Sequence, residues 1–181
     1  MRENPFVQHT PETAPPAARR PLERIEQGLG YLPAAAGRLA TSPQLLEGFQ
    51  KLNALFESTT LDPLAREVLI LTVAVRNGCH VCVAMHAKKL AALEADPALA
   101  EALRAGKPLA EPRLEAVRVF TGEVLDHTGD VPQESLDAFL GHGYTPQQAL
   151  EVVLGISTYT LTTFANRLTR APLDEQLAPY A

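Results

Sequence analysis

Four capping residues stand directly before a proline, and this pattern constrains the fold more than any other feature of the chain. The four pairs are Ser42-Pro43, Asp62-Pro63, Asp96-Pro97 and Thr145-Pro146. A Ser, Thr or Asp side chain accepts a backbone N–H that has no partner at a helix start, and the fixed φ of proline suits the first helical turn. Each pair therefore predicts the start of a helix. Glu111-Pro112 and Val131-Pro132 are weaker versions of the same signal.

Apolar residues at helical spacing follow these starts. After Pro43 the repeat is Leu45, Leu46, Phe49, Leu52 and Phe56, and after Pro146 it is Leu150, Val153, Leu154, Leu161 and Phe164. A spacing of three and four residues is typical of an amphipathic helix. Glycines at positions 78, 106, 129 and 143 mark the helix ends. The sequence shows no alternating strand pattern between hairpin turns. We therefore predict an all-α, single-domain bundle of about eight helices.

The segment 62–75 is apolar almost all round, with the run Val68, Leu69, Ile70, Leu71 and Val73 to Val75. A helix that is apolar on every side is a buried helix. Its β-branched residues make a strand the rival interpretation, but the Asp-Pro start and the length favour a helix.

The two ends of the chain differ from its middle. Six of the 15 prolines lie within residues 1–33, where we expect one short helix around Leu22–Leu29. We predict a flexible N-terminal arm over residues 1–20, a helical domain over 21–170 and a C-terminal tail over 171–181.

Charge and hydropathy exclude several classes of function. The net charge is −5 and the chain has no basic run, so nothing favours nucleic-acid binding. The first residues lack the apolar core of a secretory signal, and no uninterrupted apolar run is long enough to span a membrane. The expected compartment is the cytoplasm.

The only two cysteines lie close together in the stretch NGCHVCVAMH, residues 77–86. In a reducing compartment such a pair suggests thiol chemistry or metal binding more than a structural disulfide. Asn77-Gly78 is expected to end the buried helix, and a second helix begins near Cys79 and runs to about Leu93. Both cysteines then lie in its first turn, where the helix dipole favours a thiolate. Three residues apart, they share one face, so a reversible disulfide is feasible.

Two further residues join this pair. His86 is four residues beyond Cys82, again on the same face, and can approach its sulfur directly or through a water. Glu67 lies about as far before the turn as His86 lies after it. If the two helices fold back as a hairpin, both reach a similar depth. A carboxylate on one imidazole nitrogen raises the basicity of the other, so Glu67, His86, Cys82 and Cys79 would form a proton relay that ends in a dithiol.

This spacing resembles that of a known family. Glu67, eleven residues, Cys79, two residues, Cys82, three residues and His86 match the pattern of AhpD-like alkylhydroperoxidases of the carboxymuconolactone decarboxylase superfamily. The segments GYLPAAAGRLATSPQLLEGF, LDPLAREVLILTVAVRNGCHVC and FANRL are also similar. The resemblance covers about residues 22–170. It implies an all-α protein, a homo-oligomer (commonly a trimer or hexamer), and reduction of hydroperoxides with neither cofactor nor metal.

The resemblance also implies roles for the four residues. Cys82 would attack the O–O bond and become a sulfenic acid, Cys79 would resolve it as a disulfide, and His86 with Glu67 would relay the proton. The helix dipole alone does not choose between the two cysteines. Some family members carry a histidine directly before the second cysteine, where this chain has Val81. The thiol reductant stays open between a lipoyl protein, a thioredoxin-like protein and a small thiol.

Two alternatives remain beside the peroxidase. One is a lactone-processing decarboxylase of the same superfamily, which has no need of a cysteine pair. The other is a non-catalytic oligomeric module stabilised by a metal at Cys79, Cys82 and His86, with Glu67 as a fourth ligand.

Five residues outside the pattern are expected to have no catalytic role. His80 is interpreted as an exposed residue of the first turn and Lys88-Lys89 as a solvated face. Asn166 and Arg167 are interpreted as residues that cap a helix or form a bridge, either near the site or between subunits.

Overall fold

The computed structural model describes residues 4–181, and this part of the chain is helical, with no strand. It forms nine α-helices and one 3-10 helix: α1 Pro16–Leu29, α2 Ala34–Leu39, α3 Pro43–Glu57, α4 Pro63–Arg76, α5 His80–Ala92, α6 Pro97–Arg104, α7 Pro112–Asp126, α8 Gln133–Gly141, α9 Pro146–Thr169 and η1 Glu175–Tyr180. The all-α prediction is confirmed. The helix count exceeds the expected eight because α2 and η1 were not predicted.

The capping residues do what the sequence indicates. Ser42, Asp62, Asp96 and Thr145 each accept a backbone N–H of the helix that follows them, and proline occupies the first turn in every case. Thr145 also completes a capping box with Gln148. The segment interpreted as helix rather than strand is α4, with eight buried residues.

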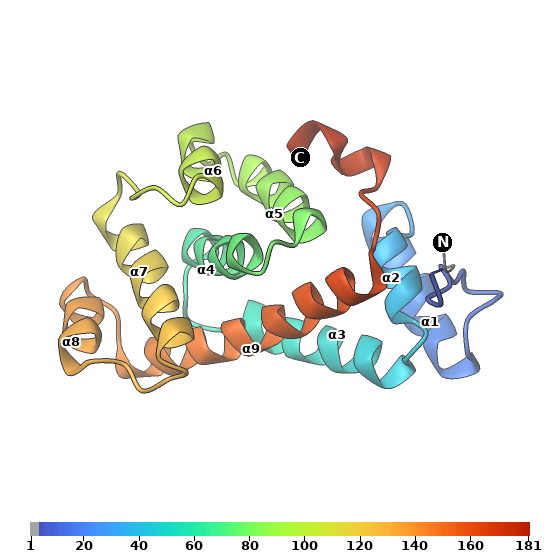
Figure 1. Ribbon diagram of the computed structural model, residues 1–181, viewed down its shortest axis with the longest axis horizontal. Coiled ribbons are helices and arrows are strands. Elements are labelled where there is room, and N and C mark those ends of the chain that lie inside the picture. The colour runs from blue at the N-terminus through green and yellow to red at the C-terminus, as the bar shows by residue number, and fades with distance from the viewer. Residues whose placement is uncertain (1–3) are drawn as a thin grey trace.

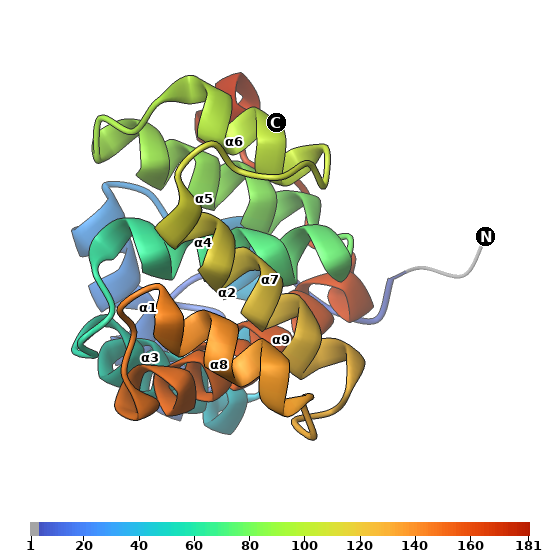
Figure 2. The ribbon, with the colours of Figure 1, turned by 90° about the vertical axis from the view of Figure 1, so that its left-hand side faces the viewer.

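Helix α4 occupies the centre of the fold (Figure 1) and contacts α5, α6, α7 and α9. The long helix α9 runs across α3 and α4, so that its C-terminal end lies beside α2. Gly155 permits this approach, since a Cβ there would lie 2.5 Å from the ring of Phe56 and 2.8 Å from Leu69. Figure 2 shows α7 and α8 facing the viewer, on the side of the molecule that lies at the left of Figure 1.

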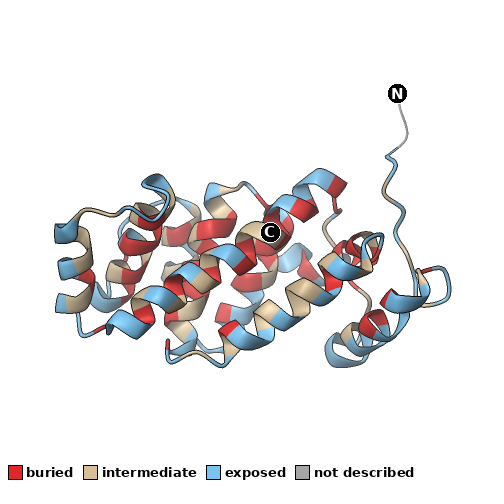
Figure 3. Ribbon diagram, turned by 90° about the horizontal axis from the view of Figure 1, so that it is seen from below, coloured by how far each residue is buried: buried red, intermediate tan, exposed pale blue. Residues whose placement is uncertain are grey.

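Most of the buried apolar residues form one core around α4, and two smaller clusters flank it. One flanking cluster surrounds the cysteines and includes Leu177 of η1, and the other joins α1 and α2 to α3 and α9. The red segments in Figure 3 follow this arrangement along the inner faces of the helices.

The ends of the chain carry more structure than the sequence suggested. Helix α1 begins at Pro16 rather than at Leu22, and it includes Pro21. The C-terminal η1 packs on α5, and Asp174 accepts a hydrogen bond from the backbone N–H of Ala34. The boundaries proposed for the arm, domain and tail stay predictions. Within residues 4–181, no helix has the length and apolar character needed to cross a bilayer.

Candidate active site

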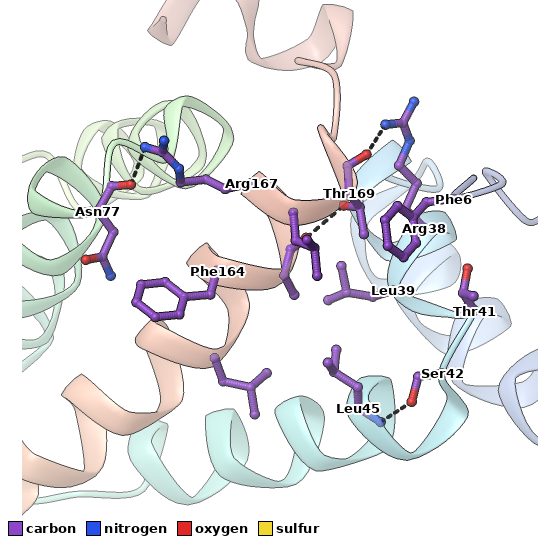
Figure 4. Close-up of a pocket in the computed structure, with 13 residues that line it drawn as sticks. Phe6, Arg38, Leu39, Thr41, Ser42, Leu45, Asn77, Phe164, Arg167 and Thr169 are labelled. Atoms are coloured by element: carbon purple, nitrogen blue, oxygen red, sulfur yellow. Dashed lines mark hydrogen bonds between the residues drawn. The ribbon is translucent and has the colours of Figure 1, made fainter. Parts of the chain in front are cut away.

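The turn between α4 and α5 sets the geometry of the site. Gly78 has a φ of +63°, a conformation that favours glycine, and the N–H of Cys79 returns to the carbonyl of Ala74. Arg167 of α9 donates from Nη1 to the carbonyls of Asn77 (2.6 Å) and Gly78 (3.1 Å). Figure 4 shows the first of these two bonds. The reversal of the chain is therefore fixed from a third helix.

The two cysteines lie at the start of α5 with their sulfurs 3.0 Å apart. Cys79 is the N-cap residue and Cys82 lies in the first turn. Both thiols are free and buried. The two thiols are hydrogen-bonded to each other, so a small rotation of the side chains would bring the pair to bonding distance.

Cys79 is the more acidic thiol. The hydrogen bond from Cys82, helped by the backbone N–H groups of Val81 and Cys82, outweighs burial and lowers the pKa of Cys79 to about 7. The same hydrogen bond, together with burial and the negative charge on Cys79, raises the pKa of Cys82. As the pH rises above about 7, the reduced pair therefore comes to carry one negative charge, centred on Cys79, and Cys82 keeps its proton.

Glu67 and His86 meet across the helical hairpin. His86 donates from Nδ1 to Oε2 of Glu67 at 2.6 Å, and both side chains are almost fully buried. Lys89 lies 3.2 Å from the other carboxylate oxygen. Burial alone would raise the pKa of Glu67, but the charge and hydrogen bond of His86, with the ammonium of Lys89, hold that pKa below its usual value. Glu67 is therefore an anion at neutral pH, and it leaves Nε2 as the ring nitrogen of His86 that is free to take a proton.

Helix α9 completes the site with two side chains. The Tyr159 ring packs edge-on against the His86 ring at 5.1 Å, and its hydroxyl donates to Oδ1 of Asn53. Asn166 donates from Nδ2 to the sulfur of Cys82 at 3.3 Å and lies 3.9 Å from that of Cys79. No hydrogen bond joins His86 to either sulfur in the described part of the chain, so a proton between them needs a bridging atom.

A cavity of about 370 Å³ opens onto this arrangement. Cys82, His86 and Asn166 lie on its wall together with Tyr159. Most of the remaining wall is apolar, with Ile25, Leu29, Leu39, Leu46, Phe49 and Met85. Cys79 does not line this cavity but borders a smaller hollow of about 250 Å³ beside His80 and Arg167. Cys82 is thus the sulfur that faces the larger, apolar space.

A second and larger cavity, of about 760 Å³, lies elsewhere on the molecule (Figure 4). It runs between α2, the start of α3 and the C-terminal half of α9, and Phe6 closes one side. It is not lined by the two cysteines, by His86 or by Glu67. Its wall includes Phe164 and Leu168, which are 59% and 69% exposed. The space is therefore an apolar groove of the surface, separate from the thiols.

The structure refines the expectations for the residues outside the pattern. His80 is exposed, as expected. Arg167 caps the end of α4, which fits the expected structural role, but Asn166 contacts the thiols themselves. Lys89 is not simply solvated, because its ammonium contacts Glu57 and Glu67. Sequence reasoning missed these contacts. Asn166 reaches Cys82 from α9, far along the chain, and the nearer partner of Lys89 is Glu57 on α3.

The side chains of the site do not form a metal-binding group. Within residues 4–181, no three His, Cys, Asp or Glu side chains are arranged to hold a metal ion. Glu67 Oε2 is already bonded to His86, and the two sulfurs are bonded to each other and to Asn166. The arrangement is suited to moving a proton and oxidising a dithiol.

Comparisons with known proteins agree with this fold. The model of the "Carboxymuconolactone decarboxylase family" matches residues 43–121, which include all four residues of the pattern. A peroxidase-related protein of Ralstonia eutropha JMP134, described as an alkylhydroperoxidase AhpD core, superposes with a TM-score of 0.85 at 20% identity, over 95% of this chain and 93% of its own. A peroxidase-related protein of Silicibacter sp. TM1040 gives 0.79 at 18% identity, over 97% and 95%.

A third similar structure is that of a protein with a different activity. It is the debrominase Bmp8 in complex with 2,3,4-tribromopyrrole, with a TM-score of 0.77 at 14% identity, over 98% of this chain and 96% of its own. No curated protein matches the chain. At such identities the similar structures establish the fold, and the reaction has to be argued from the site.

The fold is that of an all-α class of structures that includes peroxidase-related proteins. Residues 43–121 match the model of the carboxymuconolactone decarboxylase family, and the fold is similar to that of AhpD-like proteins. The resemblance noted in the sequence is confirmed.

Proposed function

We propose that the protein is a thiol-dependent peroxidase that reduces organic hydroperoxides through Cys79 and Cys82. The observation that carries the proposal is the juxtaposition of two free sulfurs, 3.0 Å apart, with a buried Glu67–His86 pair. One member of each pair, Cys82 and His86, lines a mainly apolar cavity. A dithiol supplies two electrons, and the carboxylate–imidazole pair supplies a base and then an acid.

The first step oxidises Cys82, the sulfur that faces the cavity. His86 Nε2 takes the Cys82 proton through a water in the cavity, and the thiolate attacks the terminal oxygen of ROOH. The O–O bond breaks, and the departing RO⁻ takes the proton back from His86. The balance is Cys82–SH + ROOH → Cys82–SOH + ROH. Asn166 supports this step because its N–H already points at the sulfur.

The second step closes the disulfide. The Cys79 thiolate attacks the Cys82 sulfur, the S–O bond breaks, and the leaving hydroxide is protonated to water. With a pKa of about 7, Cys79 is substantially ionised at neutral pH and is suited to the resolving role. Two reducing equivalents from an external thiol then restore the dithiol. A lipoyl protein, a thioredoxin-like protein and a small thiol all fit this chemistry.

The cavity favours a particular class of peroxide. A mainly apolar wall gains free energy from burying a hydrocarbon group and gains nothing from hydrogen peroxide. We therefore expect alkyl or aryl hydroperoxides to react faster than H2O2. We place the reaction in the cytoplasm, where an adjacent cysteine pair stays reduced between turnovers.

The proposal is tested by counting thiols. Reduced protein is treated with one equivalent of cumene hydroperoxide in a chelator-containing buffer, and free thiols are titrated with a chromogenic disulfide. We expect the loss of two thiols per chain and a mass decrease of two hydrogens in the peptide that carries residues 79–82. A reaction that leaves both thiols intact, or that links only different chains, would overturn the proposal. The lactone-processing and metal-stabilised alternatives both give that negative result.

We also propose that the protein is a homo-oligomer, a trimer or hexamer, as the family resemblance implied. The observation in favour is an apolar stripe along α9, formed by Leu150, Val153, Phe164 and Leu168, all of which are exposed in the single chain. These residues recur at the spacing of one helix face. Contact with a second copy would bury the stripe and the adjacent groove of Figure 4.

Light scattering at micromolar concentration should therefore give a multiple of the single-chain mass. Phe164→Glu combined with Leu168→Glu should shift the population toward the single chain, because an interface that buries two carboxylates without partners loses several kcal/mol, on the order of 2–5. Leu55→Glu is the matched control, since Leu55 is equally exposed but lies on α3 outside the stripe. A wild-type protein with single-chain mass would refute the assembly, and an unchanged mass in the double variant would place the interface elsewhere.

A further inference from the structure

Lys89 connects the buried pair to the protein surface. Its ammonium lies 2.6 Å from Oε1 of Glu57 on α3 and 3.2 Å from Oε1 of Glu67 on α4. The other oxygen of Glu67 accepts the hydrogen bond of His86. A single carboxylate is thus held between the imidazole of the site and an ammonium whose side chain is 46% exposed. Neither the sequence pattern nor the mechanism proposed above assigns this lysine a role.

We propose that Lys89 is a positioning residue that keeps the Glu67–His86 pair ready to accept a proton at neutral and mildly acidic pH. The inference rests on the proposed peroxidase function and adds to it a charge that tunes the base. Lys89 touches neither the sulfurs nor the cavity wall, so it acts only through Glu67.

The charges around the pair give the sign of the effect. The groups that face it are Glu57 from α3, Arg66 from α4 through its contact with Glu57, Cys82 and Lys89 from α5, and Tyr159 from α9. Of these, Lys89 is the cation in direct contact with Glu67. A positive charge beside the pair disfavours the uptake of a proton by either partner. Without Lys89 the pair takes up its proton at a higher pH and stops acting as a base sooner as the pH falls.

Glu57 provides the opposite change on the same ammonium. It forms the shorter of the two contacts of Lys89 and neutralises part of its charge. Removing the charge of Glu57 leaves Lys89 to act fully on Glu67. The pair should then release its proton more readily, so the base should stay active to lower pH. A network that only holds the helices together gives no reason for two substitutions to shift a pH profile in opposite directions.

The test is the rate of disulfide formation with cumene hydroperoxide from pH 5 to pH 9. Lys89→Met should move the acid limb of the profile to higher pH and lower the rate at pH 6 by about three- to tenfold, with convergence on the wild type at high pH. The expected change in rate is modest because the ammonium of Lys89 is half exposed, and solvent therefore screens its charge. Glu57→Gln should move the limb to lower pH. Lys88→Met is the control, since Lys88 is exposed and lies over the Tyr31 ring, away from Glu67.

Two outcomes overturn the inference. One is an acid limb that coincides in the wild type, Lys89→Met and Glu57→Gln, and the other is a uniform loss of rate at every pH. A second readout does not depend on activity: carboxyl ¹³C NMR of the reduced protein, with the Glu67 signal identified by its absence in Glu67→Gln. The Glu67 carboxyl should titrate at a higher pH in Lys89→Met. If the wild type loses no thiols to peroxide, the proposed function fails, and this titration still decides whether Lys89 tunes Glu67.

Discussion

Cys82→Ser is expected to reduce peroxide-driven oxidation to the background rate, a loss on the order of 10³-fold or more. Cys82 is the sulfur on the wall of the apolar cavity that His86 shares, and it is the one held by the amide of Asn166 at 3.3 Å. A serine hydroxyl is too weak a nucleophile and too high in pKa to replace it. The measurement is the consumption of cumene hydroperoxide, followed together with trapping of sulfenic acid by dimedone.

The Cys79→Ser variant tests which of the two cysteines reacts first with the peroxide. It should still react once with peroxide, and because no resolving thiol remains, the sulfenic acid at Cys82 should persist and be trapped by dimedone. The low pKa of Cys79 makes the reverse order a real competitor, because Cys79 is the better-ionised thiol. Against that order, Cys79 borders only the smaller hollow and not the apolar cavity. A Cys82→Ser protein that carries the dimedone adduct on Cys79, beside an inert Cys79→Ser protein, would exchange the two roles.

Much of the fold was predictable because its signals are local. A capping side chain and a proline act within one turn, so Ser42, Asp62, Asp96 and Thr145 mark their helices without any knowledge of the packing. Helix α2 carries no such signal. It follows Pro33, which offers no side-chain cap, and it is only six residues long, so its stability comes from burial against α3 and α9.

The start of α1 and the existence of η1 were not predictable for a related reason. Pro21 inside a helix reads as a break, yet α1 runs through it from Pro16 to Leu29. The 3-10 helix at the C-terminus is held by long-range contacts: Leu177 is buried beside the cysteines, and Arg104 donates to the carbonyl of Tyr180. Contacts between residues so far apart leave no periodic trace in the sequence.

The candidate site also contains some contacts that the sequence predicts and others that it does not. Glu67 and His86 could be paired in advance because a helical hairpin has fixed rise, and equal distances from the turn place two residues at one depth. The cysteine spacing placed both sulfurs on one face. The contacts of Asn166 with Cys82 and of Lys89 with Glu57 could not be placed in this way, since they join α9 and α3 to α5 across long separations in the sequence. Helix crossings are set by the packing of the whole core.

Glu67→Gln is expected to slow disulfide formation by on the order of 10²-fold or more, and to do so evenly from pH 6 to pH 8. The buried carboxylate holds His86 at 2.6 Å and balances the positive charge that forms when the free ring nitrogen takes a proton, whereas an amide of the same shape supplies no charge. The pKa of Glu67 is lowered by His86 and Lys89 against the effect of burial. Because the pKa of Glu67 is lowered in the folded protein, its charge and the stability that this charge gives are fully present above the pKa of an unfolded glutamate. They are lost only as the pH falls through the lower pKa of the folded state. The wild type therefore keeps this charge throughout the assay, and the variant lacks it throughout.

The fold of Glu67→Gln should survive. The amide oxygen can accept the His86 N–H, and Lys89 can turn fully to Glu57, its nearer partner at 2.6 Å, because its side chain is half exposed. Circular dichroism and oligomer mass check this point. Glu57→Gln is the matched control, with the same chemical change at the surface end of the network, and its rate at pH 8 should stay close to that of the wild type. A folded Glu67→Gln protein that reacts at the wild-type rate would remove Glu67 from the mechanism. The reactivity of the dithiol would then come from the start of α5 and from Asn166, with no relay through His86.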